Sequence, residues 1–213
     1  MILKIKNNLK LLPYLFRSFY FCLQYFPFHI AIRIPVLISS NVRLLKTKGT
    51  LELQVKDIEF GIVRIGFGHV GIFDSKISKS IWEVSGKIIF KGHTNIGHGS
   101  KICVGTNGVL SIGKNFCITA ESSIICFNSI TIGDDCLFSW DVLILDTDFH
   151  KIKKGNEHIN KEKPIKIGDH NWVGCRTTIL KGAEAGSNCV IGSQSLLNKN
   201  ILVIESLLQV ILQ

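Results

Sequence analysis

The chain has 213 residues, 46% of them hydrophobic, and a formal net charge of +9. This length allows one domain with a sizeable core, and the charge suits anionic partners such as a phosphorylated cofactor, a nucleotide-linked sugar, nucleic acid or an anionic membrane. Seven cysteines, an odd number without a C-x-x-C pair, argue against a disulfide framework and favour reduced packing residues in a cytoplasmic protein. No cleavable signal peptide is evident.

Residues 1–35 differ in composition from the rest of the chain. Their aromatic and aliphatic run lies between Arg17 and Arg33, which is too short for a membrane span of about 20 apolar residues. Lysines beside leucines near the start predict an amphipathic segment. Two interpretations stay open: the segment contacts an anionic membrane surface, or it packs as a helix on the domain that follows or on a neighbouring subunit.

Residues 36–85 predict the first, irregular coils of a repeat, and Trp82 is expected to pack or cap there. Regular repeats begin near Gly86. His93 and His98 lie in the first regular repeats. Lone histidines at the corners between repeats are expected to be solvated, since a metal site would need a third ligand close by.

The most regular pattern runs from Ile132 to Leu197. An apolar residue returns every six positions, a period that fits neither an α-helix nor a flat strand. These residues are Ile132, Phe138, Ile144, Ile167, Val173, Ile179, Ala185, Ile191 and Leu197. The pattern predicts an all-β parallel β-helix over residues 86–200, in which a flat side of about six residues repeats around a prism. A β-sandwich fits less well, because the spacing of its strands varies.

A second inward position precedes each of several repeat residues by two. Four residues occupy this position: Cys136, Val142, Thr177 and Cys189. Residues two apart in a strand lie on the same face, so these side chains are expected inside the prism.

The repeat is interrupted after Asp146-Thr-Asp-Phe-His150. Residues 151–163 contain no hexapeptide and are expected to leave the prism as a loop, and the coil resumes at Pro164. Long loops on a compact scaffold are usually functional or disordered. The junction before this loop is therefore the predicted place of the chemistry.

Three segments carry a resemblance to a known family. They are Ile-Gly-Asp-Asp-Cys at 132–136, Ile-Gly-Asp-His-Asn-Trp-Val-Gly at 167–174 and Ala-Gly-Ser-Asn-Cys-Val-Ile-Gly-Ser at 185–193. In these segments the chain resembles the hexapeptide-repeat acyltransferases, and most of all the branch that contains galactoside and maltose acetyltransferases and the O-acetyltransferases of bacterial surface polysaccharides. The resemblance covers about residues 86–199 and implies a left-handed β-helix and a homotrimer.

The resemblance also implies a reaction. The histidine between coil and loop in the family is the general base that takes a proton from an acceptor hydroxyl, and His150 matches it. Asp148 or Asp146 is expected to accept a hydrogen bond from its other ring nitrogen. The acyl donor implied is acetyl-CoA, without a metal. Direct transfer without an acyl-enzyme is expected, because no cysteine has a neighbouring base by sequence; Cys175, before Arg176, is the least improbable nucleophile. The acceptor implied is a sugar or lipid-linked saccharide, and nucleic acid is not an implied partner.

Further site residues follow by position in the later coils. The resemblance suggests acetyl-CoA contacts at Trp172, Gly174, Arg176, Lys181, Ser193 and Lys199. On the acceptor side it suggests Thr119 and Asp141. Thr119 stands where the family often has asparagine, which puts a galactoside or maltose acceptor in doubt.

The last residues depart from the family, whose members continue with a Gly-Asn-Pro-Ala-like stretch. Codons for that stretch, read one base later, give the Gln-Val-Ile-Leu found at 209–212. Residues 201–213 are therefore expected to be an altered or truncated tail.

Two other functions stay open. A metal-dependent hydro-lyase of the β-helix carbonic anhydrase type would draw ligands from His150, His158, His170 or His93. A non-catalytic β-helix scaffold would fold and bind nothing. The preferred prediction is a cytoplasmic acetyl-CoA-dependent O-acetyltransferase, placed by residues 1–35 at the inner face of the membrane if these contact it.

Overall fold

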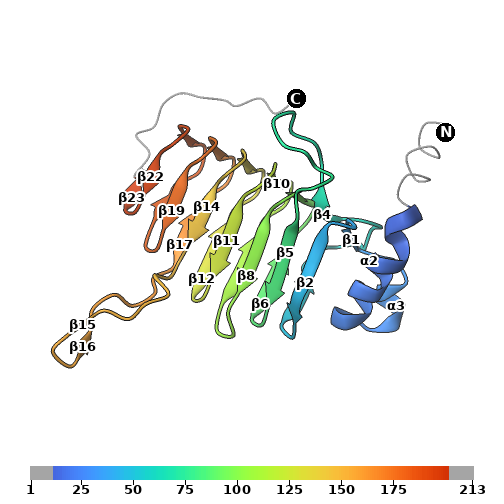
Figure 1. The fold of residues 1–213 in the computed structure, drawn as a ribbon, viewed down its shortest axis with the longest axis horizontal. Helices are drawn as coiled ribbons and strands as arrows, with labels where there is room; N and C mark the ends of the chain where they lie inside the picture. The colour runs from blue at the N-terminus through green and yellow to red at the C-terminus, as the bar shows by residue number, and fades with distance from the viewer. Residues whose placement is uncertain (1–11, 202–213) are drawn as a thin grey trace.

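The computed structural model describes residues 12–201 as a three-sided prism whose N-terminal end is covered by two helices (Figure 1). The first side consists of β1 (Val36–Ile38), β4 (Val63–Phe67), β7 (Thr94–Gly97), β10 (Phe116–Ile118), β13 (Leu137–Phe138), β18 (Trp172–Val173) and β21 (Val190–Ile191). The second consists of β2 (Val42–Thr47), β5 (Ser80–Val84), β8 (Lys101–Val104), β11 (Ser123–Cys126), β14 (Leu143–Leu145), β19 (Thr178–Leu180) and β22 (Leu196–Leu197). The third consists of β3 (Thr50–Leu53), β6 (Lys87–Phe90), β9 (Val109–Ile112), β12 (Ser129–Ile132), β17 (Ile165–Ile167), β20 (Glu184–Ala185) and β23 (Asn200–Ile201). We call these sides A, B and C.

Each strand pairs in parallel with the strand one coil further along the prism. On side A, Ile118 pairs with Phe138, and Phe138 pairs with Val173. Every side therefore contributes one strand to each of seven coils, which we number from the N-terminus. The predicted all-β parallel β-helix is confirmed.

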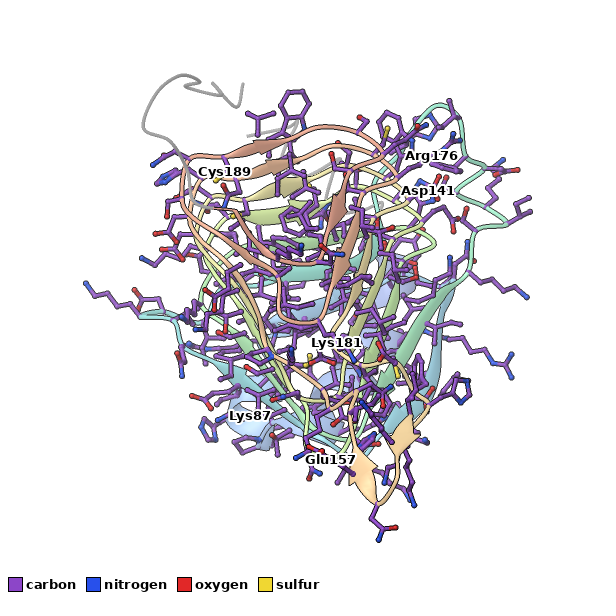
Figure 2. All side chains as sticks on the ribbon, turned by 90° about the vertical axis from the view of Figure 1, so that its left-hand side faces the viewer. Lys87, Asp141, Glu157, Arg176, Lys181 and Cys189 are labelled. Carbon is purple, nitrogen blue, oxygen red and sulfur yellow. The ribbon has the colours of Figure 1, made fainter. Side chains whose placement is uncertain are left out.

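The helix is left-handed. Figure 2 looks along the prism with the C-terminal coils toward the viewer, and Arg176, Lys181 and Cys189 lie at three different corners. From Arg176 through Lys181 to Cys189 the chain runs clockwise while it advances toward the viewer, which is the left-handed sense.

The core is a set of stacked apolar columns inside the prism. All repeat residues predicted to point inward are buried, and so are the second inward residues Cys136, Val142, Thr177 and Cys189, each at most 9% exposed. Phe116 and Phe138 stack edge to face, with ring centroids 5.2 Å apart. Because each coil covers its neighbours, the core stays continuous although each strand is short.

The corners of the prism require a left-handed backbone conformation, with positive φ, that few residues adopt readily. Asn115, Asp135, His170 and Asn188, between sides C and A, have positive φ near 53–61°, where Asn and Asp are tolerated best. Gly133 permits close stacking there, since a Cβ would come within 2.5 Å of the Gly168 carbonyl carbon.

The N-terminal end of the prism is covered by α2 (Leu12–Tyr25) and α3 (Phe28–Ala31). Phe21 packs against Trp82 at 5.4 Å between ring centroids, and the Trp82 indole N–H donates to the Tyr25 hydroxyl at 2.8 Å. The described part of residues 1–35 thus packs as a helix on the β-helix, and residues 1–11 lie outside the description. None of the helices described is long and apolar enough to pass through a bilayer.

Two segments leave the prism. Residues 68–79 leave between sides A and B in coil 2, and residues 146–164 leave between sides B and C in coil 5 and contain the hairpin β15 (Lys153–Lys154) and β16 (Glu157–His158) (Figure 1). The expectation that His98 is solvated was wrong. Its residue is 1% exposed, because the first segment covers it with the Phe73 ring 6.3 Å away. Apart from Ile201, the predicted altered tail at 201–213 lies outside the described residues.

Candidate active site

Asp146 fixes the point at which the second segment leaves the prism. It follows β14, is fully buried, and accepts hydrogen bonds from the backbone N–H groups of Phe127 at 2.7 Å and Asn128 at 2.9 Å. These donors belong to the corner of the preceding coil. Both carboxylate oxygens are therefore occupied in holding two corners together, which compensates the burial of the charge.

Phe149 has a strained backbone beside the predicted base. Its φ is +59°, a conformation that is a true outlier for a bulky side chain. Its ring is held edge to face against Phe127 at 5.3 Å, and the next residue, His150, donates its backbone N–H to the Asp148 carbonyl at 2.6 Å. Such strain clusters at functional sites. The resulting tight turn leaves the His150 side chain exposed.

Asn160 joins the two ends of the loop by hydrogen bonds. Its side-chain amide N–H group donates to the His150 carbonyl at 2.7 Å and to Asp148 Oδ2 at 2.9 Å, and its oxygen accepts the Ile152 N–H at 2.6 Å. One side chain thus joins the outgoing and the returning strand of the loop. The sequence offered no signal for this role, because Asn160 lies among lysines outside any repeat.

Lys181, from the corner of coil 6, completes this closure. Its ammonium group donates to Asp148 Oδ2 and to the Asn160 carbonyl at 3.1 Å, and the side chain is only 19% exposed. Hydrogen bonds from Lys181 and then Asn160 lower the pKa of the Asp148 carboxyl group. We call Asp148, Asn160 and Lys181 the loop clasp.

The two carboxylates predicted to orient the His150 imidazole, those of Asp146 and Asp148, bind other groups. Within residues 12–201, neither Asp146 nor Asp148 accepts a hydrogen bond from the ring. Asp146 binds backbone of the preceding coil and Asp148 belongs to the loop clasp. That one of them orients the imidazole stays a prediction.

The other predicted site residues lie on a different part of the prism. Figure 2 shows Asp141 and Arg176 together at the corner between sides A and B, well separated from Lys181 at the corner between B and C. Thr119, Gly174 and Ser193 follow strands of side A and belong to the same A–B corner. Trp172 is on side A and 40% exposed, and Lys199 lies between β22 and β23 at the B–C corner. One chain therefore does not gather the predicted base and most predicted cofactor residues at one place.

The A–B corner has the chemistry of a binding surface. Arg176 Nε lies 3.7 Å from Asp141 Oδ2, an ion pair that leaves the arginine side chain 62% exposed. Gly174 stacks closely on the next coil, since a Cβ would lie 2.5 Å from the Ser193 backbone nitrogen. The Thr119 hydroxyl is buried without a hydrogen-bond partner among the described residues.

Four of the seven cysteines, Cys22, Cys126, Cys136 and Cys189, are buried packing residues. Burial raises the pKa of Cys22 and of Cys136 to about 11, and it raises the pKa of Cys126 further, with the Asp146 charge adding to the effect. A thiol with a raised pKa is a poor nucleophile at neutral pH.

The metal ligands considered from the sequence do not converge within the chain. His93 and His170 lie at the C–A corner, whereas His150 and His158 belong to the segment at the B–C corner. In residues 12–201, no three His, Cys, Asp or Glu side chains gather in an arrangement that would hold a metal ion.

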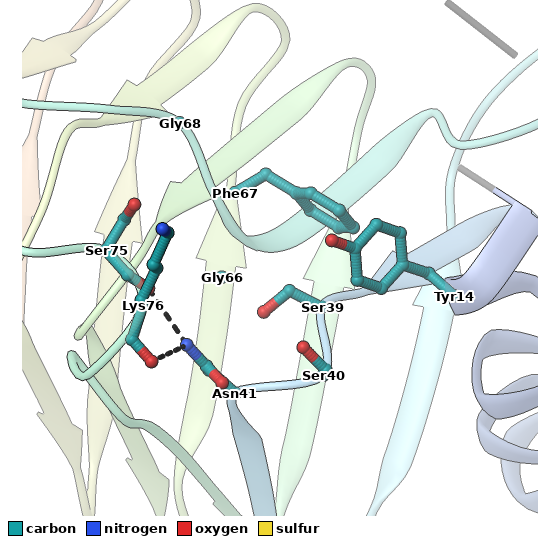
Figure 3. Close-up of a pocket in the computed structure, with 9 residues that line it drawn as sticks. All are labelled: Tyr14, Ser39, Ser40, Asn41, Gly66, Phe67, Gly68, Ser75 and Lys76. Atoms are coloured by element: carbon teal, nitrogen blue, oxygen red, sulfur yellow. Dashed lines mark hydrogen bonds between the residues drawn. The ribbon is translucent and has the colours of Figure 1, made fainter. Parts of the chain in front are cut away.

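A polar pocket of about 330 Å³ lies in coils 1 and 2, between α2 and the segment 68–79 (Figure 3). The Asn41 amide N–H group donates to the carbonyls of Ser75 and Lys76, both at 2.9 Å, and so closes one wall. Tyr14 and Ser39 face the pocket on the helix side. None of the predicted site residues lines it, and it lies three coils from His150.

Comparison with known proteins gives relatives of one kind. The chain is 33% identical to galactoside O-acetyltransferase of Escherichia coli K12 over 95 residues, which cover 43% of this chain and 46% of that protein. It is 30% identical to polysialic acid O-acetyltransferase of Neisseria meningitidis over 148 residues, which cover 68% of this chain and 52% of that protein. It is 25% identical to the putative lipopolysaccharide biosynthesis O-acetyl transferase WbbJ of E. coli K12 over 126 residues, which cover 54% of this chain and 64% of that protein.

The chain thus spans about half the length of the first two relatives. A solved structure, that of the polySia-specific acetyltransferase NeuO, aligns with a TM-score of 0.43 and 23% identity over 78% of this chain and 70% of that one. No family model matches the chain. The resemblance to O-acetyltransferases with hexapeptide repeats is confirmed by these relatives.

Proposed function

We propose that this relative of the galactoside and polysaccharide O-acetyltransferases transfers an acetyl group from acetyl-CoA to a sugar hydroxyl, with His150 as general base. The observation that carries the proposal is the place of His150. It is exposed beside a strained residue, where a long segment leaves an otherwise regular prism. Histidine is the side chain whose ordinary pKa lies closest to neutral, which suits a base for hydroxyl groups.

The reaction needs one base and no covalent enzyme intermediate. As the acceptor oxygen attacks the thioester carbonyl carbon, the imidazole takes the hydroxyl proton. The C–S bond then breaks, the protonated imidazole returns the proton to the sulfur of CoA, and the acetyl ester remains on the sugar. The raised pKa values of the buried cysteines support direct transfer over an acyl-cysteine.

The site is completed by a second copy of the chain. Two groups of residues lie at different corners of one prism: His150 with the loop clasp at the B–C corner, and Arg176 with its neighbours at the A–B corner. In a homotrimer of parallel prisms, the B–C corner of one copy faces the A–B corner of the next. The hairpin β15–β16 projects away from its own prism (Figure 1). In the proposed trimer it reaches toward that neighbour.

Acetyl-CoA lies between the two copies in this proposal. Arg176 and Lys199 are exposed cations that can bind its phosphates. Gly174, Ser193 and Trp172 are proposed to contact its pantetheine arm. For Lys181 we propose a positioning role in place of a contact with acetyl-CoA, since its ammonium group belongs to the loop clasp.

The acceptor is a saccharide of the bacterial surface or its lipid-linked precursor, modified in the cytoplasm where acetyl-CoA is available. The names of the relatives support this class. On the acceptor side, we assign the carboxylate of Asp141 to hydrogen bonds with sugar hydroxyls. Thr119, whose buried hydroxyl has no hydrogen-bond partner within residues 12–201, is assigned to the lining of the acceptor site.

The test is acetyl transfer from labelled acetyl-CoA to galactosides, oligosialic acid and lipopolysaccharide oligosaccharides, followed by mass spectrometry of the sugar. An acetyl ester on one of these acceptors that His150→Ala does not form supports the proposal. A trimer that binds neither acetyl-CoA nor any saccharide of the panel would contradict it and favour the non-catalytic scaffold.

A further inference from the structure

Helix α2 has two apolar faces, only one of which packs on the β-helix. Phe21 and Cys22 are fully buried against the first two coils, where they contact Trp82 and Val36. On the other face Phe16 is 87% exposed, Tyr20 is 64% exposed and Leu23 is 41% exposed. Residues at such spacings of four and three lie above one another on a helix, so these side chains form one stripe.

The stripe continues onto α3 and beyond it. Phe28 is 64% exposed and Ile32 is 58% exposed. An apolar groove of about 350 Å³ lies beside them and is lined by Leu15, Phe16, Phe19, Ile32 and Ile34. We call Phe16, Tyr20, Leu23, Phe28 and Ile32 the N-terminal stripe. A contiguous apolar surface that includes aromatic rings marks an interaction site more often than a free surface.

The net positive charge is concentrated in the part of the sequence that contains the stripe. The first 51 residues contain eight basic residues and no Asp or Glu, which leaves 17 basic against 16 acidic residues in the remainder. The eight are Lys4, Lys6, Lys10, Arg17, Arg33, Arg43, Lys46 and Lys48. Aromatic and aliphatic side chains beside a purely cationic segment are complementary to an anionic bilayer, whose acyl boundary takes the rings and whose headgroups take the charge.

We infer that the N-terminal stripe docks this protein on an anionic membrane surface. This deepens the proposed function, on which it rests for the lipid-linked acceptor. The helices α2 and α3, which carry the stripe, cover the coil-1 end of the prism (Figure 1), whereas His150 follows β14 in coil 5. Four coil spacings place the base about 19 Å above coil 1, and the helix layer adds about 10 Å, a total that an oligosaccharide on a lipid carrier can span. Three parallel prisms would present three stripes to one surface, which strengthens weak single contacts.

The experiment is co-sedimentation of the full chain with phosphatidylglycerol-rich vesicles and with vesicles of phosphatidylcholine alone. The wild type is expected to sediment with the anionic vesicles, less so as salt is raised, and weakly with the neutral ones. The Phe16→Ser, Phe28→Ser double variant is expected to lose at least about tenfold in partitioning, because two rings no longer enter the bilayer. Ile77→Ser, which changes a side chain 74% exposed on the segment 68–79, is the matched control and is expected to bind like the wild type.

Two kinds of result, in binding and in oligomeric state, would overturn the inference. One is a wild type that stays in solution with anionic vesicles, or a double variant that sediments as well as the wild type. The other is a double variant that changes the oligomeric state in light scattering, which would make the stripe a contact between copies. A second assay keeps this test separate from the proposed function. The double variant should transfer acetyl groups to a soluble saccharide at the wild-type rate, because that reaction does not need the membrane. His150→Ala should bind vesicles normally.

Discussion

Lys181 and Asp148 form an ion pair across the boundary between coils 6 and 5, at the point where the loop leaves the prism. Asn160 joins the same carboxylate to the returning strand of the loop. The rigid stack of coils thereby determines where the loop begins and ends. His150 takes its position from this closure, because its own carbonyl is one of the groups that Asn160 binds.

Removing the ammonium group of the loop clasp should impair transfer without impairing donor binding. Lys181→Met leaves the stem of the side chain and deletes two hydrogen bonds, so the junction that carries His150 loosens. We expect acetyl transfer to fall about tenfold to a hundredfold, since small displacements of a catalytic group are costly. Lys166→Met, which deletes an exposed pair with Glu184, is the control and should transfer at the wild-type rate. Equal rates in both variants would contradict a positioning role.

The loop clasp should open in acid. Hydrogen bonds lower the pKa of Asp148 below its unfolded value of about 3.9, so its stabilising contribution is present above that pH and is lost as the pH falls through the folded pKa. Protection of the Ile152 and Ile159 amides against hydrogen exchange should be constant from neutral pH down to about 4 and should drop below it. Asp148→Asn should remove this acid transition. A transition that persists unchanged in the variant would assign it to another group.

The stacked rings inside the prism should dominate stability. Phe138→Ala empties a fully buried site beside Phe116 and should lower the free energy of unfolding by about 3–5 kcal/mol. Ile77→Ala, on an exposed segment, should change it by less than about 0.5 kcal/mol. Denaturant unfolding followed by circular dichroism measures both. Similar midpoints for the two variants would mean that the core tolerates the cavity.

An active site shared between copies of a homotrimer, as proposed above, predicts complementation. His150→Ala and Arg176→Glu each damage one half of every site, so each homotrimer alone should be nearly inactive. Mixed trimers contain sites whose two halves are both wild type. Refolding the variants together should therefore restore transfer well above the sum of the separate preparations. No gain, with mixed trimers shown by mass spectrometry, would place both residues in the site of one chain or outside it.

The sequence was sufficient to predict the architecture because every coil repeats the same physical requirement. An inward residue every six positions and a second one two earlier, such as Val142 before Ile144, can be recognised without the structure. His98 was predicted wrongly, because a period cannot show that a distant segment folds over one corner. The role of Lys181 in the loop clasp depends on a contact between two coils, which no local pattern encodes.

The most direct test of the account compares wild type and His150→Ala in calorimetric titration with acetyl-CoA and in acetyl transfer to a saccharide acceptor. The account predicts that both proteins bind acetyl-CoA with similar affinity, since the imidazole acts on the acceptor hydroxyl. It also predicts that transfer falls by about 10²–10⁴-fold in the variant, the usual contribution of a general base. Wild-type rates in His150→Ala would contradict the account.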